Sequence, residues 1–235
     1  MALAVRTQEL SRAYDDDYAL IGLTATFHSG TTTAILGPNG AGKSTLLHLL
    51  TLMMRPTEGT IFFNDVEAKP NSENHRSKIG YVGHQTMLYR TRTGRENLMF
   101  FGRLYGLDEL TSRVDELLTV VGLSDAAHRN VEEYSRGMAQ RLTIARALLP
   151  KPSLLLLDEP FTGLDQQGHR LAEDLFREQR EQGAITLLVS HDLSATARIA
   201  DQCLVLKRGR LQYQGPVGDS LQSVYQRALQ EGAVT

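Results

Sequence analysis

The chain has 235 residues, which suffices for one compact α/β unit with a sizeable core but is cramped for two independent domains. With 25 basic and 27 acidic residues the formal net charge is -2, so composition gives no electrostatic footprint for nucleic acid or for an anionic membrane surface. Cys203 is the only cysteine, which excludes an intrachain disulfide and a cysteine-cluster metal site and suits a reducing compartment; we expect it to be buried. The sequence begins without a basic segment followed by an apolar run, and its apolar runs fall far short of the roughly 20 residues of a membrane-spanning helix. We therefore expect a cytoplasmic protein.

The first third of the chain predicts short strands around one helix. Residues 3–36 alternate between apolar and polar types and are rich in Thr, Val, Ile and Leu, with a turn at 28–31. From Gly42 onward, apolar residues recur at helical spacing until the turn RPTEG. Residues 60–66 and 78–83 are again typical of strands.

The middle of the chain predicts helices, and the last third predicts strands that alternate with helices. Helical periodicity runs from about residue 94 to 149 in three segments, and Pro150 ends the last of them. Continuous apolar runs at 154–157 and 185–189 favour strands that are buried on both faces. Strands that alternate with helices predict a parallel sheet with helices on its faces, so the expected fold class is α/β.

The segment GPNGAGKS follows a predicted strand and precedes a predicted helix, which is the context that the phosphate-binding pattern G-x-x-x-x-G-K-[ST] requires. Glycine lets the backbone curl until several amides point at phosphate oxygens, and it leaves the ligand's space free of side chains. The following helix directs its positive end to the same place. We expect Lys43 to reach the β- and γ-phosphates and Ser44 to ligate Mg²⁺; a glycine-rich turn without a ligand is the alternative. The predicted nucleotide-binding residues of this segment are Gly37, Pro38, Asn39, Gly40, Ala41, Gly42, Lys43, Ser44 and Thr45.

Two adjacent carboxylates, Asp158 and Glu159, end the predicted strand LLLL. Kinases, GTPases and motors share the phosphate-binding loop, so these acids are needed to distinguish between reactions. We expect Asp158 to hold Mg²⁺ through a water molecule and Glu159 to polarise the water that attacks the γ-phosphate. A kinase does not need the second acid, because its nucleophile is a substrate hydroxyl. Hydrolysis is therefore the leading reaction, and the alternative is that both acids merely cap the next turn.

The motifs GPNGAGKST, YSRGMAQR, LLLLDEPFTGLD and VSHD occur in this order and resemble those of the ATP-binding cassette ATPases over essentially the whole chain. The resemblance implies a P-loop NTPase fold with a RecA-like parallel sheet core, an antiparallel β subdomain and an inserted α-helical subdomain. It implies one nucleotide-binding domain over residues 1–235, with a catalytic core in approximately 1–85 and 150–235 and a helical subdomain in approximately 86–149. ATP and Mg²⁺ are the implied cofactors, and ATP hydrolysis coupled to transport is the implied reaction.

In that family two copies, or two homologous subunits, pair head to tail, and the signature of one chain closes over the γ-phosphate held by the other. YSRGMAQR corresponds to this signature, so the resemblance implies that Ser135 and Gly137 contact the partner's nucleotide. Ser135 is also a natural N-cap, and a hydroxyl with free amides at a helix start suits an anion; a capped helix without a ligand is the alternative. Tyr134, Arg136 and Met138 depart from the usual signature. Arg136 either adds charge to the site or faces solvent.

The resemblance places four further residues at the nucleotide. Gln85 matches the glutamine that senses Mg²⁺ and the attacking water, and His191 matches the histidine that donates a hydrogen bond to the γ-phosphate. A surface glutamine and a satisfied core histidine are the alternatives. Asp165 matches the loop that communicates across the dimer, although an aspartate that caps the next helix would look the same. Tyr14 matches the aromatic residue that stacks on adenine, with Tyr18 as its rival.

The resemblance also implies a place at the membrane: a peripheral subunit on the cytoplasmic face of the inner (cell) membrane, with integral membrane transporter subunits as partners and no nucleic acid. Segment 86–106 is rich in Arg, Tyr and Phe, and in transporter members this lobe receives a short helix of the membrane subunit. YSRGM, VGHQ and DEPFTGLD together resemble the ATPase subunit of the bacterial haem exporter used in cytochrome c maturation. The alternatives are another exporter, of drugs, polysaccharides or lipids, and a soluble ATPase of iron–sulfur assembly. The seven histidines lack ligand spacing, so we do not expect His84 to bind haem.

Overall fold

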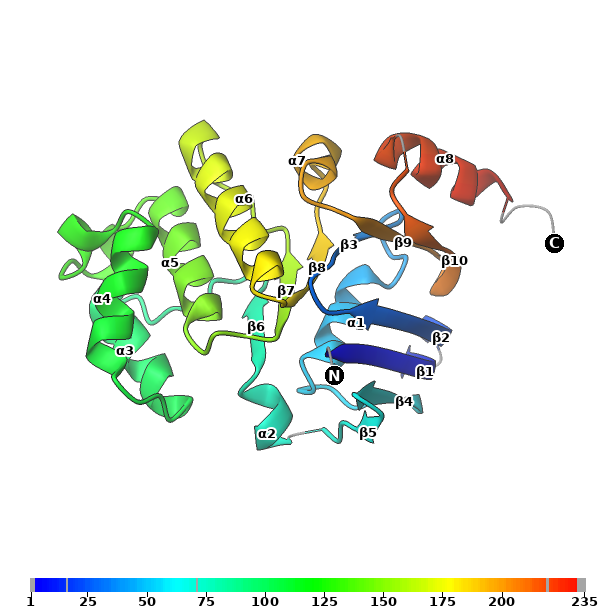
Figure 1. Cartoon of the computed structure of the whole chain (residues 1–235), viewed down its shortest axis with the longest axis horizontal. Coiled ribbons are helices and arrows are strands. Elements are labelled where there is room, and N and C mark those ends of the chain that lie inside the picture. The colour runs from blue at the N-terminus through cyan, green and yellow to red at the C-terminus, as the bar shows by residue number, and fades with distance from the viewer. Residues whose placement is uncertain (1–2, 16, 71, 219, 232–235) are drawn as a thin grey trace.

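A computed structural model describes residues 3–15, 17–70, 72–218 and 220–231 (Figure 1). At their centre these residues form a six-stranded sheet in the order β10-β9-β3-β8-β7-β6. The strands from β9 to β6 are parallel, and β10 pairs antiparallel with β9 at the edge. The strands are β3 (Thr32–Leu36), β6 (Ile79–Val82), β7 (Leu154–Asp158), β8 (Ile185–Val189), β9 (Gln202–Lys207) and β10 (Arg210–Pro216).

A second, smaller sheet lies beside the first and is antiparallel, in the order β2-β1-β4-β5 (Figure 1). Its strands are β1 (Ala4–Tyr14), β2 (Asp17–His28), β4 (Glu58–Phe63) and β5 (Val66–Glu67). The α-helices of the described residues are α1 (Lys43–Leu50), α2 (Glu73–Arg76), α3 (Gly94–Leu104), α4 (Leu110–Val120), α5 (Arg136–Leu148), α6 (Gln166–Glu181), α7 (Leu193–Ala197) and α8 (Leu221–Glu231). A parallel core with an antiparallel β subdomain confirms the predicted fold class.

Strand β7 shows why the apolar runs of the sequence become buried strands. All of its residues are buried, and successive side chains point to opposite faces of the sheet. Leu154 and Leu156 join the hydrophobic core that contains α1 and the antiparallel sheet. Leu155 and Leu157 join a second core, built with side chains of α5 and α6. The strand that ends in Asp158 is therefore held from both sides, and truncating one of these leucines to alanine is expected to cost about 2–5 kcal/mol of stability.

Helices α3, α4 and α5 pack together on one side of the molecule (Figure 1). A capping box starts α3: the Thr93 hydroxyl accepts from the Glu96 amide at 3.1 Å, and Glu96 accepts from the Thr93 amide at 2.9 Å. Arg95 of α3 pairs with Asp115 of α4. These are the three helical segments that the periodicity predicts between residues 94 and 149.

Cys203 lies in β9 and has no exposed surface, as predicted. Burial raises the pKa of its thiol to about 11. Among the described residues, no helix combines the length and the apolar character needed to cross a membrane.

Candidate active site

Glycines shape the loop that joins the end of β3 to the start of α1. Gly42 has a φ of 99°, and a Cβ atom there would lie 2.3 Å from the carbonyl oxygen of Ala19 in β2. A Cβ atom at Gly37 would lie 2.4 Å from the carbonyl oxygen of Leu206 in β9. We expected these glycines to leave room for a ligand, but at both positions the structure shows close contact with neighbouring strands. At Gly40 a Cβ atom would meet nothing within 4 Å, so this glycine does leave the space in front of the loop open.

Lys43 is the first residue of α1, and its ammonium group bridges the loop. Nζ donates to the carbonyl oxygens of Gly37 at 2.8 Å and Pro38 at 3.0 Å. Burial lowers the pKa of Lys43, and the nearby carboxylates of Glu159 and Asp158 oppose that shift. The loop therefore places a basic group beside two carboxylates at the end of β7.

A cavity of about 430 Å³ opens over the loop. It collects residues from segments far apart in the sequence, namely β2, the loop, and the ends of β6, β7 and β8. Its lining is Ala19, Asn39, Gly40, Ala41, Gly42, Lys43, Ser44, Thr45, His84, Asp158, Glu159, Val189 and His191. All of these except Ala19, His84 and Val189 were predicted from the sequence.

Glu159 leaves the line of β7 and turns its carboxylate toward His191. Its backbone has a φ of 54°, a strained value for glutamate, and its amide donates to the Val189 carbonyl at 2.8 Å. Oε2 accepts from the His191 amide at 3.3 Å, and Oε1 lies 3.5 Å from His191 Nε2. Oε1 is buried and has no hydrogen-bond partner among the described residues. A buried acceptor that lacks a donor is suited to hold a water molecule.

The oxygen donors in the cavity fit a hard cation. Ser44 and Asp158 both line it, and Asp158 is buried at the end of β7. Magnesium is usually held by one or two protein oxygens together with phosphate and water. Among the described residues no group of three or more His, Cys, Asp and Glu side chains forms a protein-only metal site. Ser44 and Asp158 fit Mg²⁺ that is bound together with a nucleotide.

The predicted signature residues lie at the start of α5, outside the residues that line the cavity. Ser135 caps α5, because its hydroxyl accepts from the Met138 amide at 3.2 Å. The Gly163 carbonyl lies 3.0 Å from the position that a Cβ atom at Gly137 would take. A Cβ atom at Gly163 would come within 2.7 Å of Arg136 Cγ. The stem of Arg136 thus packs over Gly163 of the DEPFTGLD motif, an arrangement that the sequence did not predict.

Two further hydrogen bonds involve the DEPFTGLD segment, residues 158–165: one joins it to α5 and the other caps α6. Gln140 is buried and donates from Nε2 to the Pro160 carbonyl at 2.8 Å. Asp165 caps α6, because its Oδ1 accepts from the Gly168 amide at 2.7 Å. Capping is the alternative that we considered for Asp165, and Asp165 is not among the residues that line the cavity.

Gln85 is exposed and follows β6, but its neighbour His84 lines the cavity instead. The segment is held by Arg146 of α5, which donates to the carbonyl oxygens of Thr86 and Tyr81, each at 2.9 Å. We did not predict this role. The signal in the sequence was an arginine within the apolar periodicity of LTIARALL, since a buried cation there needs acceptors.

Tyr14 is 42% exposed and is not among the residues that line the cavity. Its hydroxyl contacts Met54 Sδ at 3.3 Å, and the Arg12 guanidinium lies 4.9 Å from the centre of its ring. Tyr18, the rival, is also exposed, and its hydroxyl lies 3.4 Å from Glu58 Oε1. The cavity therefore does not indicate which of the two tyrosines would stack on adenine.

A glycine-rich loop between a central parallel strand and a helix, with acids at the end of a nearby strand, defines a P-loop nucleoside triphosphatase. Comparison with known proteins narrows this class. Residues 20–162 match the family model described as ABC transporter.

Relatives and solved structures agree with this match. The daunorubicin/doxorubicin resistance ATP-binding protein DrrA of Streptomyces peucetius is 36% identical over 230 residues, or 96% of this chain and 69% of DrrA. The Nod factor export ATP-binding protein I of Sinorhizobium fredii is 38% identical over 210 residues, or 88% of this chain and 61% of that protein. The structure of an ATP-binding subunit of an ABC transporter has a TM-score of 0.88 at 30% identity, covering 96% of this chain and 99% of that one. A bacterial ABC transporter cassette described as dimeric has a TM-score of 0.83 at 26% identity, covering 91% of this chain and 98% of that one.

The chain therefore belongs to the ABC transporter family. It is an ABC-type ATPase subunit that binds ATP and whose activity is coupled to transport.

Proposed function

We propose that the chain is the ATP-hydrolysing subunit of a membrane exporter and that two such subunits share each ATP. The observation that carries the hydrolytic part is the cavity over the loop. It brings the phosphate-binding amides, Lys43, Asp158, Glu159 and His191 to one place, although they come from distant parts of the sequence. This constellation serves attack of water on a triphosphate.

Each residue has a role in that reaction. The loop amides and Lys43 hold the β- and γ-phosphates, with Ser44 and Asp158 as the residues that would hold Mg²⁺. Bound Mg²⁺ would neutralise charge on the phosphate oxygens. Glu159 Oε1, buried and free of a hydrogen bond among the described residues, accepts a proton of the attacking water as it bonds to the γ-phosphorus. His191 lies beside this carboxylate and donates to a γ-phosphate oxygen as the bond to the β-phosphate breaks.

A second copy, or a homologous subunit, is needed because the capped start of α5 lies outside the cavity of its own chain. Ser135 is exposed, and the amides that follow it suit an anion. Head-to-tail pairing brings Ser135 and Gly137 to the partner's γ-phosphate and Asp165 to the interface. A related cassette is described as dimeric, which supports the pairing of two copies. The roles of Gln85 at the attacking water and of Tyr14 at adenine remain predictions, because neither residue lines the cavity.

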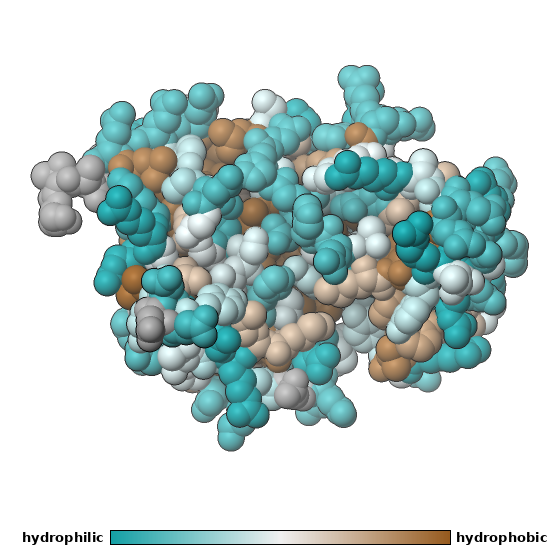
Figure 2. Space-filling view, turned by 180° about the vertical axis from the view of Figure 1, so that it is seen from behind, coloured by the Kyte–Doolittle hydropathy of each residue, from teal (hydrophilic) through white to brown (hydrophobic). Residues whose placement is uncertain are grey.

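A groove of about 660 Å³ supports the proposal that the chain binds a membrane partner. Residues of α2, β6, α3 and α5 line it, and it includes the apolar side chains Met53, Met87, Phe101 and Leu104. Three of these, Met53, Met87 and Leu104, are exposed. Figure 2 shows that apolar residues on the far face gather in patches within a mostly hydrophilic surface. We propose that segment 86–106 and this groove receive a short segment of an integral membrane subunit, which keeps the ATPase at the cytoplasmic face of the membrane.

The substrate is proposed from the relatives. DrrA is named for drug resistance and the Sinorhizobium protein for export of Nod factor, a different kind of molecule. These names favour another exporter, of drugs, polysaccharides or lipids, over the haem export that the YSRGM motif suggested. Haem export remains the second candidate because of that motif and VGHQ.

The function is tested with the purified chain and two carboxylate variants. Glu159→Gln is expected to keep ATP binding, to lose nearly all turnover and to accumulate an ATP-bound dimer, because water activation is removed while the phosphate contacts stay. Glu67→Gln in β5 makes the same charge change at an exposed position away from the cavity and serves as the control. Normal hydrolysis by Glu159→Gln would refute the assignment.

The partner and substrate are tested with the complex extracted from membranes. A tagged chain is expected to co-purify with an integral membrane subunit, and the ATPase rate of the complex should rise with an amphipathic drug rather than with haem. A haem absorption band in the complex, with stimulation by haem, would favour the second candidate. Recovery of the chain with iron–sulfur assembly proteins instead of a membrane subunit would refute the transport proposal.

A further inference from the structure

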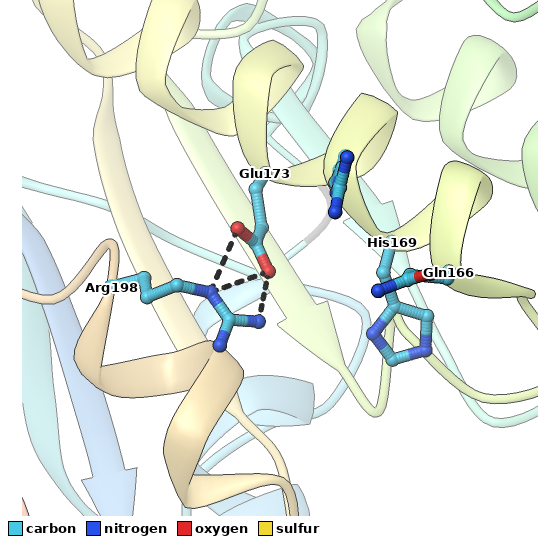
Figure 3. A pocket seen from close by; sticks show the side chains of 5 residues that line it. Gln166, His169, Glu173 and Arg198 are labelled. Carbon is cyan, nitrogen blue, oxygen red and sulfur yellow. Dashed lines mark hydrogen bonds and ion pairs between the residues drawn. The ribbon is translucent and has the colours of Figure 1, made fainter.

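An ion pair joins α6 and α7 across a groove that shares no lining residue with the cavity over the phosphate-binding loop. The groove has a volume of about 530 Å³ and is lined by Gln166, His169, Arg170, Glu173 and Arg198. Figure 3 shows the guanidinium of Arg198, at the end of α7, facing the carboxylate of Glu173 on α6. Arg198 Nε lies 3.1 and 3.0 Å from the two carboxylate oxygens, and an Nη atom lies 2.5 Å from Oε1. The two helices are thus joined by a multidentate contact.

The two partners differ in exposure. The Glu173 side chain is 8% exposed, whereas the Arg198 side chain is 52% exposed. Within the described part of the chain, all hydrogen bonds to the Glu173 carboxylate come from Arg198. A buried carboxylate without its cation is costly, so the position of Arg198 is set by Glu173 and not by packing alone.

Both helices begin at predicted functional residues. Asp165 caps α6, and α7 begins directly after His191, with Asp192 as its cap. Asp192 Oδ1 accepts from the Ala195 amide at 2.9 Å, and the Thr196 hydroxyl donates to the Asp192 carbonyl at 2.8 Å. These bonds make α7 one short, continuous unit from the His191 loop to Arg198.

The His191 side chain has little packing of its own to hold it. It is 71% exposed, so its place near Glu159 depends on the backbone from which it projects. That backbone leads into α7, and α7 is held to α6 by the Glu173–Arg198 contact together with buried Ala195, which lies in the same hydrophobic core as Phe176 of α6. A shift of α7 therefore moves the histidine relative to the carboxylate that it contacts.

We propose that Glu173 and Arg198 are positioning residues for ATP hydrolysis: their ion pair holds α7 against α6 and so places His191 beside Glu159. Neither residue touches the nucleotide cavity, and the inference rests on the proposed hydrolytic function. Because the phosphate loop is not involved, loss of the pair slows turnover without weakening ATP binding.

The test measures kcat, the KM for ATP and the Kd for ATP of Arg198→Ala in the full chain, normalised to ATP-binding sites. We expect kcat to fall about 3- to 30-fold, the range typical of residues that couple through a contact network, with Kd changed less than about twofold. Arg177→Ala is the matched control, since Arg177 lies on α6, as Glu173 does, but pairs with Asp174 of the same helix at 2.7 Å. The control is expected to keep the parent kcat.

A double variant, Glu173→Ala with Arg198→Ala, separates positioning from stability. It leaves no unpaired buried charge, so its unfolding midpoint should recover relative to Arg198→Ala, while its kcat should stay low. A parent-like kcat in either the single or the double variant would overturn the inference. A parent chain without ATPase activity would refute the proposed function itself, whereas an active parent matched by Arg198→Ala refutes only the role of the ion pair.

Discussion

Replacing Arg146 with methionine is expected to destabilise the segment that leads to Gln85. Arg146 is 6% exposed and holds this segment through the Thr86 and Tyr81 carbonyls, each at 2.9 Å. Its guanidinium also lies 5.2 Å from the centre of the Phe101 ring. Methionine keeps the length and the apolar contacts but removes both donors.

The expected change in the free energy of unfolding combines the hydrogen bonds that are lost with the desolvation cost that is removed. Two hydrogen bonds from a charged donor contribute about 1.5–3 kcal/mol each, so the gross loss is about 3–6 kcal/mol. Burial lowers the pKa of Arg146, which shows that the cation is buried at a cost, and methionine removes that cost. We therefore expect Arg146→Met to lower the free energy of unfolding by about 2–4 kcal/mol and to reduce kcat, since Thr86 adjoins Gln85.

Urea unfolding followed by circular dichroism measures the first effect, and ATPase assays below the unfolding midpoint measure the second. Arg141→Met is the matched control: Arg141 also lies on α5 and donates to two carbonyl oxygens, those of Val121 at 2.9 Å and Gly122 at 3.1 Å. It should lose stability while keeping the parent kcat. An Arg146→Met protein with the parent midpoint and the parent kcat would show that the two carbonyl contacts are not needed.

Three other outcomes follow from single positions. Burial raises the pKa of Tyr81 to about 12 from 10.0, so Tyr81 ionises at lower pH in the unfolded chain than in the folded one. Its contribution to stability should be complete below pH 10 and fall by up to about 3 kcal/mol as pH rises through 12. Tyr81→Phe should lack this part of the decline in denaturant titrations. Gly42→Ala should cost roughly 1–3 kcal/mol and weaken ATP binding, because its φ of 99° and the nearby Ala19 carbonyl both oppose a Cβ atom; parent-like affinity by calorimetry would contradict this. Gly163→Ala should also be destabilised by roughly 1–3 kcal/mol, and Arg136→Gly should restore part of that loss in thermal unfolding, because the new methyl group would collide with the stem of Arg136.

The strongest sequence patterns predicted the centre of the fold. Leu154 to Leu157 form a continuous apolar run, and such a run fits a strand buried on both faces, which is what β7 is. Elements β5 and α2 were not predicted, because two and four residues are too few to show a period. Edge strand β10 and helix α8 were also missed, although Leu211 and Tyr213 alternate with polar residues in β10.

The residues of the candidate site likewise fall into two groups, those that local motifs predict and those that only the tertiary fold brings together. Local motifs predicted Lys43, Asp158 and Glu159, because a loop between strand and helix determines where they lie. Ala19 and His84 line the same cavity but belong to distant segments, so only the tertiary fold brings them there. Long-range contacts of this kind leave no local pattern in one sequence.

The burial of Cys203 in β9 has a practical consequence for labelling experiments on this ATPase subunit. Cys203 is the chain's single cysteine, it is inaccessible, and its raised pKa keeps it protonated near neutrality, so alkylating reagents should spare it. A cysteine introduced on an exposed part of the surface would then be the one thiol that takes a spin label or a fluorophore. In the proposed dimer, distances between two such labels, one on each copy, would report how the copies move relative to each other without prior replacement of Cys203.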